Sequence, residues 1–155
     1  MEYEGALMRD DEIVDALNDL IEMDHNAIGG YNSAINGLKD QPEIRKTFEG
    51  FRADHERHVQ ELSPFVAQYG GEPAKHPGAM GVLQKGWTEV SKLGGADAIL
   101  SAMVSNEQTA VNTYEQGAAK AFPSEILRVV ERGVADERRH LSYCQAQYER
   151  LKKAA

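Results

Sequence analysis

The sequence Ala53-Asp54-His55-Glu56-Arg57-His58 returns 82 residues later as Ala135-Asp136-Glu137-Arg138-Arg139-His140, with four of the six positions identical. Each copy ends in a histidine and carries an aspartate four residues before it. Residues three and four apart share one face of a helix, so each copy presents several ionisable groups to the same neighbour. The repeat therefore points to a duplicated helical unit.

A second pair of residues repeats at almost the same distance. Asp24 precedes Tyr31 by seven residues, and Glu107 precedes Tyr114 by the same interval, 83 positions further along. Each half of the chain thus supplies an acid, a tyrosine and then, about 30 residues after the acid, the paired motif. The sequence predicts two copies of a helical hairpin related by a pseudo-two-fold axis.

Apolar residues recur at intervals of three and four along most of the chain, which is the spacing of amphipathic helices. Proline and glycine interrupt this pattern at few places, so the helices are long. Pro64 falls inside the second pattern, where it should bend the helix rather than end it. We expect helices at about 10–38, 43–69, 97–121 and 124–152, with a shorter one near 80–92.

The lengths of the connections predict how these helices are arranged. The connections 39–42 and 122–124 are short, which makes the helices they join antiparallel neighbours. The segment 70–96 is long enough to carry the chain back along a helix of about 42 Å. Two antiparallel hairpins joined by one long crossover form the ferritin-like topology of the four-helix bundle. We therefore predict a single all-α domain over 1–155 with this fold.

Ionisable residues interrupt the apolar face of every long helix near its middle. A buried carboxylate without a partner costs several kcal/mol or more, so it must be paired, protonated or bound to a metal ion. Because the interruptions lie at matching depths, they should converge on one point in the bundle. The residues are Asp24, His55, His58, Glu107, Glu137 and His140.

The spacing of these residues favours a site for two metal ions. Glu137 and His140 are three residues apart on one helix face, and this motif with single acids from two other helices is the arrangement of di-iron and di-manganese carboxylate bundles. Mixed oxygen and imidazole ligands favour iron or manganese, with zinc as an alternative. We expect Asp24 and Glu107 to bridge the two ions and each half to add its histidine.

At these residues the sequence resembles the ferritin-like superfamily, above all small bacterial ferritin-like proteins of unassigned function that are grouped with stress-induced proteins. The spacing of Asp24 and Tyr31 and the motif from Glu137 to His140 also resemble bacterioferritin and rubrerythrin. The resemblance extends over about residues 10–152. It implies a non-haem di-iron centre that oxidises Fe(II) with O₂ or peroxide.

Two residues depart from the pattern of that family. The first motif has His55 where the family has a glutamate, and the acid of the first helix is Asp24, which is one methylene shorter than glutamate. The site would then contain three carboxylates and three histidines. This composition weakens the negative charge that favours ferric iron.

Four further residues have expected roles around the site. We interpret Asp54 and Asp136, one residue off the apolar faces, as groups that orient His58 and His140 through the other ring nitrogen. Asp54 is also an alternative to His55 as the ligand from the second helix, since the rotation of that helix decides which points inward. Tyr31 and Tyr114 are interpreted as core aromatics with a polar tip, with a redox or proton role as the alternative.

The amino-acid composition limits the classes of partner that the chain is expected to bind. Its 17 Lys and Arg against 25 Asp and Glu give a net charge of −8, which argues against nucleic acid because nucleic-acid binders have a basic face. No apolar run approaches the length of a membrane span, and the acidic first residues do not resemble a secretory signal. The single cysteine, Cys144, fits a cytoplasmic location. Metal ions and O₂ or peroxide are the expected partners, and an apolar face around Trp87 would suit a homodimer.

These observations support two principal hypotheses for function. The first is a dimetal oxidoreductase or iron-handling protein in iron or stress response. The second is a non-enzymatic stress or interaction module that keeps the bundle with one metal ion or none, and the departures at His55 and Asp24 favour it. Iron storage in a cage ranks below both, because the sequence shows no obvious fifth helix after the fourth.

Overall fold

The computed structural model describes residues 6–77 and 90–154. Within these residues the chain forms four long α-helices, one short 3₁₀ helix and no strand, so the prediction of an all-α chain with four long helices is confirmed. The short helix expected near 80–92, including Trp87, lies mostly outside the described residues. The elements are α1 (Asp10–Gly37), α2 (Pro42–Gln68), η3 (Val90–Leu93), α3 (Ala96–Ala118) and α4 (Ser124–Ala154).

Local sequence accounts for where the helices begin and end. The first turn of α1 contains three acidic residues, 10–12, and negative charge is favourable at the positive end of the helix dipole. Pro42 opens α2, where its missing N–H donor has no helical partner to lose. The same helix runs through Pro64 and ends at Gln68. Gly70 follows with a φ of 86°, a left-handed conformation that glycine adopts without steric cost.

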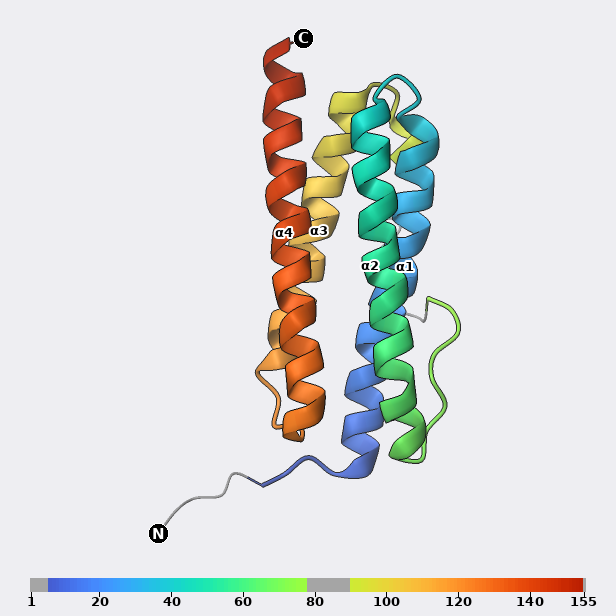
Figure 1. Ribbon diagram of the computed structural model, residues 1–155, viewed down its shortest axis with the longest axis vertical. Coiled ribbons are helices and arrows are strands. Elements are labelled where there is room, and N and C mark those ends of the chain that lie inside the picture. The colour runs from blue at the N-terminus through green and yellow to red at the C-terminus, as the bar shows by residue number, and fades with distance from the viewer. Residues whose placement is uncertain (1–5, 78–89, 155) are drawn as a thin grey trace.

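The helices pair as two antiparallel hairpins. α1 packs mainly against α2, and α3 packs mainly against α4, while α1 faces α3 and α2 faces α4 across the bundle. Figure 1 shows that α2 and α3 run in the same direction, so the connection between them takes the chain from one end of the bundle to the other. None of the helices in the described part of the chain is long and apolar enough to cross a membrane.

The core consists of two apolar sections separated by a polar layer. Leu17 and Leu20 of α1 meet Leu62 of α2 on one side of the layer, and Phe48 of α2 lies on the other side with Ile99 of α3. All of these side chains are at most 2% exposed. Burying large apolar side chains stabilises the bundle on both sides, which holds the polar layer in the middle.

Candidate metal centre

All six ionisable residues expected to converge lie in this polar layer. Each is at most 3% exposed, and among the described residues the other buried side chains with a nitrogen or oxygen atom are Asn26, Tyr31 and Tyr114. The layer therefore brings three carboxylates and three imidazoles together inside an apolar core. The six are Asp24 from α1, His55 and His58 from α2, Glu107 from α3, and Glu137 and His140 from α4.

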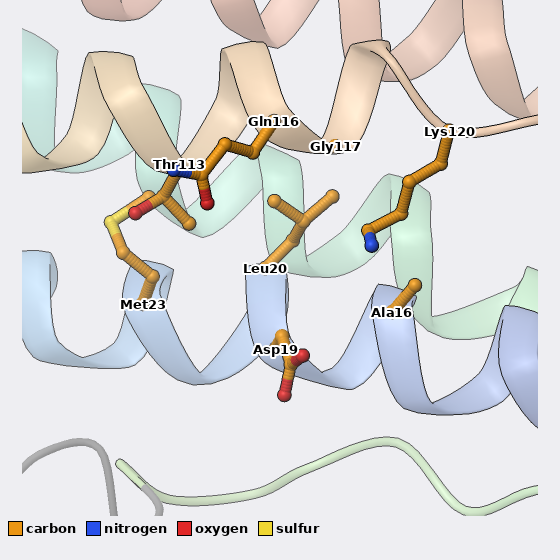
Figure 2. A pocket seen from close by; sticks show the side chains of 8 residues that line it. All are labelled: Ala16, Asp19, Leu20, Met23, Thr113, Gln116, Gly117 and Lys120. Atoms are coloured by element: carbon orange, nitrogen blue, oxygen red, sulfur yellow. The ribbon is translucent and has the colours of Figure 1, made fainter.

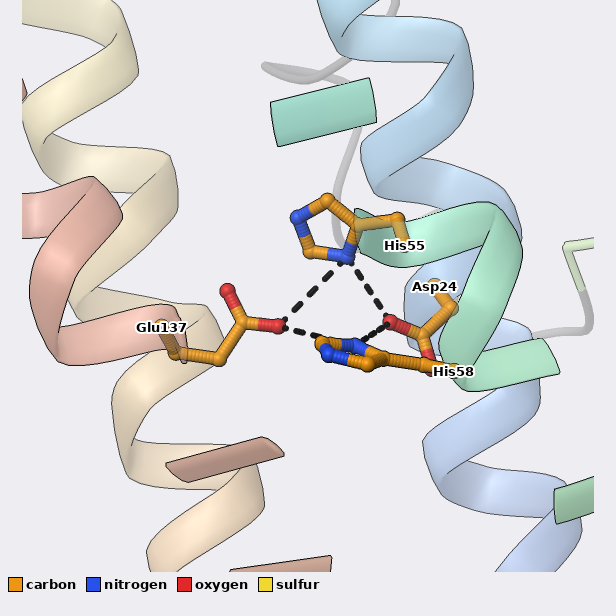
Figure 3. Close-up of side chains that lie close together, drawn as sticks. All are labelled: Asp24, His55, His58 and Glu137. Atoms are coloured by element: carbon orange, nitrogen blue, oxygen red, sulfur yellow. Dashed lines mark hydrogen bonds and ion pairs between the residues drawn. The ribbon is translucent and has the colours of Figure 1, made fainter. Parts of the chain in front are cut away.

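Four of these residues form one group of potential metal donors, drawn in Figure 3, which we call position A: Asp24, His55, His58 and Glu137. The Oδ1 atom of Asp24 lies 2.8 Å from Nδ1 of His55 and 3.1 Å from Nδ1 of His58. From the opposite hairpin, Oε1 of Glu137 lies 3.4 Å and 3.6 Å from the same two nitrogens. Two oxygens and two nitrogens thus surround one point.

A second group of donors, position B, comprises His55, Glu107, Glu137 and His140. The Oε2 atom of Glu137 lies 3.3 Å from Nδ1 of His140, and Oε2 of Glu107 lies 3.8 Å from the same nitrogen. Nε2 of His55 is 4.0 Å from Oε1 of Glu107. The two buried clusters could therefore hold metal ions side by side.

The residues common to both positions differ from our expectation. Asp24 and Glu107 were expected to bridge two ions, but Asp24 belongs to position A alone and Glu107 to position B alone. His55 and Glu137 are the residues that the two positions share. A bridging role for Asp24 and Glu107 stays a prediction, and the placement of the donor atoms favours His55 and Glu137 as the groups between the two positions.

The two tyrosines each engage one oxygen of these two acids. The hydroxyl of Tyr114 donates to Oδ2 of Asp24 at 2.7 Å, and the hydroxyl of Tyr31 donates to Oε1 of Glu107. Burial, reinforced by the nearby carboxylates, raises the pKa of both hydroxyls well above the ordinary range, so both remain protonated donors. One oxygen of each acid is engaged by the tyrosine of the other hairpin, which leaves the remaining oxygen to face the centre.

Asp54 and Asp136 do contact the two histidines, but crosswise. We expected each aspartate to serve the histidine on its own helix; instead Oδ2 of Asp136 lies 2.9 Å from Nε2 of His58, and Oδ2 of Asp54 lies 2.8 Å from Nε2 of His140. The imidazole rings extend towards the facing helix, so the nearest aspartate belongs to that helix. Because Nε2 is engaged on the outside, Nδ1 of each ring faces the centre.

Asp54 was also considered as an alternative ligand. The structure places His55, and not Asp54, among the converging donor atoms. Asp54 instead lies at the edge of the layer against His140, with its side chain 21% exposed. The rotation of α2, which the sequence left open, therefore turns His55 inward.

Two arginines that the sequence analysis did not assign to the site complete this arrangement. Arg57 lies 2.6 Å from Asp136 and 3.4 Å from Asp54, while Arg139 lies 2.7 Å from Asp54 and 3.2 Å from Asp136. Although burial opposes ionisation, hydrogen bonds from His140 and Arg139 lower the pKa of Asp54 to about 2. The 82-residue repeat, which pairs Arg57 with Arg139, is the signal that could have identified both.

The donor set fits a metal ion because part of it lacks partners. Neither Oε1 nor Oε2 of Glu137 accepts a hydrogen bond within the described part of the chain, and the same holds for Oε2 of Glu107 and Nδ1 of His140. Burial raises the pKa of Glu137. A buried carboxylate without hydrogen bonds is unfavourable by several kcal/mol, and a cation between these atoms would satisfy them. Oxygen and imidazole donors suit divalent iron, manganese or zinc.

The layer is closed to large molecules. A pocket of about 210 Å³ lies between α1 and α3 (Figure 2), but it is lined by none of the six buried ionisable residues. Leu20 and Met23, both 2% exposed, form part of its wall on α1, and Met23 directly precedes Asp24 in the sequence. Because all six ionisable residues are at most 3% exposed, ions and very small molecules are the ligands that the centre can accommodate.

Comparison with known proteins identifies a family for most of the chain. No curated protein and no solved structure gives a match. A family model described as a domain of unknown function (DUF2383) matches residues 12–120. This stretch contains α2, α3 and all but the first two residues of α1, and with them Asp24, His55, His58 and Glu107. The chain belongs to the family of the domain of unknown function DUF2383.

Proposed function

We propose that this protein is a ferritin-like, dinuclear metal-binding protein that oxidises Fe(II) or handles O₂ or peroxide in iron or stress response. Iron is the first candidate for the metal, and manganese and zinc are the alternatives. The main support for this proposal is the position of Glu137. Its buried carboxylate has Oε1 facing position A and Oε2 facing position B. Neither oxygen accepts a hydrogen bond from the described residues.

The arrangement of the helices supports the ferritin-like interpretation. Each of the four long helices contributes at least one buried donor, and α2 and α4 contribute a pair each. Ferritin-like bundles build two-metal sites in this way, with paired motifs on two helices and single acids on the other two. The parallel course of α2 and α3, joined by the long crossover, is the connectivity that this topology requires (Figure 1).

The chemistry divides between the ions and the chain. When bound, two ferrous ions would supply one electron each, which suffices to convert one hydrogen peroxide and two protons into two waters. The chain would hold the ions through three carboxylates and three imidazoles and would exclude bulk water from them. Tyr31 and Tyr114 keep Glu107 and Asp24 in place through hydrogen bonds. A redox or proton role for either tyrosine remains a prediction.

Metal analysis after anaerobic loading with Fe(II), followed by a ferrous-oxidation assay, tests this proposal. We expect about two ions per chain, and oxidation faster than in protein-free buffer. Glu137→Gln should remove both properties. Glu149→Gln, an exposed acid on the same helix, should remove neither and serves as the matched control. A folded chain that binds less than one ion even under anaerobic loading would overturn the proposal.

One observation favours the second candidate function, a non-enzymatic module. Asp24 is already paired with His55, His58 and Tyr114 through its two oxygens, so this part of the layer is stabilised by the chain itself. Glu107→Ala and His140→Ala separate the two candidates. If the centre is catalytic, oxidation disappears while the metal-free bundle stays folded; if it is a stabilising core, the main effect is a lower free energy of unfolding.

A further inference from the structure

We infer that the two positions are unequal: position A takes the first divalent ion through four protein ligands, and position B takes a second ion more weakly. This inference rests on the proposed function, because it assumes that the centre binds metal. It concerns the order and the coordination of the ions, which neither the family match nor the repeat specifies. The first ion would be a first-row divalent cation that accepts two imidazole nitrogens and two carboxylate oxygens.

The spacing of the donor atoms is the first argument. At position A, four donor pairs are separated by 2.8, 3.1, 3.4 and 3.6 Å. Four ligands placed tetrahedrally at about 2.0–2.1 Å from an ion lie about 3.3 Å from one another. At position B, the corresponding distances are 3.3, 3.8 and 4.0 Å. The two shortest distances at position A are hydrogen bonds of Asp24. An ion that replaces their protons needs only a small widening there, whereas position B must contract.

The chemistry of His55 is the second argument. A neutral imidazole has a lone pair on one ring nitrogen and a proton on the other, so it can ligate only one ion. Nδ1 of His55 lies 2.8 Å from Asp24 and 3.4 Å from Glu137, both at position A. In the metal-free chain Nδ1 donates its proton to Asp24. An ion at position A would replace that proton, and the proton on Nε2 would then be directed towards Glu107. Position B is then left with three ligands.

The repeat explains how this inequality arises. Position 55 corresponds to position 137 in the 82-residue repeat. A carboxylate has two oxygens and can face both positions at once, as Glu137 does. A neutral imidazole at position 55 cannot do the same. A histidine in place of a glutamate at position 55 therefore adds a strong ligand to position A and removes a shared ligand from position B.

Anaerobic titration of the metal-free protein with Co²⁺ tests the inference, with visible absorption and calorimetry as readouts. Four-coordinate Co²⁺ absorbs much more strongly than six-coordinate Co²⁺, so the spectrum reports coordination independently of any activity. We expect two binding steps. The first equivalent should give the intense spectrum, and the second should bind at least about tenfold more weakly, a difference of about 1.4 kcal/mol.

Matched variants from the two hairpins show which binding step belongs to which position. His58→Asn should remove the first, intensely absorbing step, whereas His140→Asn should leave it and remove the second. His55→Glu should bring the two affinities together. Circular dichroism of each metal-free variant checks folding, and the two steps of the unmodified chain test the inference even if a variant does not fold.

The outcomes separate this inference from the proposed function. Two equal equivalents in the unmodified chain, or loss of the intense step in folded His140→Asn, would overturn the inequality and leave the proposed function in place. A folded chain that binds no Co²⁺ would overturn both.

Discussion

The hairpin α1–α2 and the hairpin α3–α4 supply nearly the same set of groups to the centre, yet their contributions are not equivalent. Asp54 and Asp136, like Tyr31 and Tyr114, make matching contacts across the bundle. His55 and Glu137 occupy corresponding places and differ in chemistry. A symmetric scaffold therefore carries an asymmetric centre, and the asymmetry lies in the shared ligands rather than in the groups that orient them.

The packing of the two hairpins also differs at a second pair of residues that the 82-residue repeat relates. The ring of Phe51 stacks on His140, with 4.2 Å between the ring centroids. Gly133 corresponds to Phe51 in the repeat, and a Cβ atom there would lie 2.3 Å from the Tyr114 ring. One hairpin thus supplies an aromatic ring against a histidine, while the other removes a side chain to make room for a tyrosine.

The largest effect on stability is expected when Glu137, which belongs to both positions, is compared with Asp24, which belongs to one. With each ion at 100 times its Kd, two independent ions would add about 5 kcal/mol to the free energy of unfolding. Glu137→Gln should abolish nearly all of this gain, whereas Asp24→Asn should abolish about half, because Asp24 belongs to position A alone. Denaturant unfolding with and without Mn²⁺ measures the gain. Equal losses in the two variants would contradict the assignment of Glu137 as the shared ligand.

The next effect is the dependence on pH of the free energy of unfolding of the metal-free protein. Although burial opposes protonation, hydrogen bonds to Asp136 and Asp24 raise the pKa of His58 from about 6.5 to about 9. A raised folded-state pKa stabilises the fold below pH 6.5, and this contribution, about 3 kcal/mol, is lost as the pH rises through 9. Denaturant unfolding between pH 6 and 10 should show the decline. His58→Asn should flatten it, and a decline that is unchanged in this variant would assign it to other groups.

The free energy of unfolding of the metal-free protein should also fall at low pH. The pKa of Asp54 is lowered to about 2, so its stabilising contribution is present above pH 4 and is lost as the pH falls towards 2. The metal-free protein should therefore be most stable between about pH 4 and 6.5.

A smaller effect tests the crosswise orientation of the histidines. Removing a carboxylate that orients a metal-bound histidine typically lowers metal affinity about 10–100-fold. Asp136→Asn should weaken the step that depends on His58, and Asp54→Asn should weaken the step that depends on His140. Calorimetric titration of both variants resolves the two steps. The reverse assignment would show that each aspartate acts within its own hairpin.

The smallest expected effect probes the packing difference. Gly133→Ala should lower the free energy of unfolding by about 2 kcal/mol, because the new methyl group collides with the buried ring of Tyr114. Gly50→Ala is the matched control, since Gly50 is exposed within α2 with nothing near its Cβ position. This change should instead stabilise the helix by about 0.5–1 kcal/mol. Thermal unfolding of both variants checks the signs, and a neutral Gly133→Ala would show that Tyr114 is free to move.

Much of the fold and the identity of the buried groups could be predicted, because both depend on spacing along one helix. The interval between Glu137 and His140, or between Asp24 and Tyr31, fixes which residues share a face. The apolar residues around them fix that this face is buried. Asp24 and Glu107 therefore stand out as acids in an apolar face, and the structure buries both.

The remainder depends on how one helix faces another, which spacing does not encode. The crosswise pairing of Asp54 with His140 arises from the reach of an imidazole between α2 and α4. Tyr31 and Tyr114 engage one oxygen of each remaining acid across the bundle. These are contacts between residues 76 to 90 positions apart, and they exist only in the assembled bundle.

Anomalous scattering from crystals grown with excess Fe(II) under anaerobic conditions tests the central claim most directly. We predict two peaks inside the bundle, one among the donors of position A and one among those of position B, on opposite sides of the Glu137 carboxylate. A map with no peak in the polar layer, or with peaks at exposed carboxylates alone, would contradict the account.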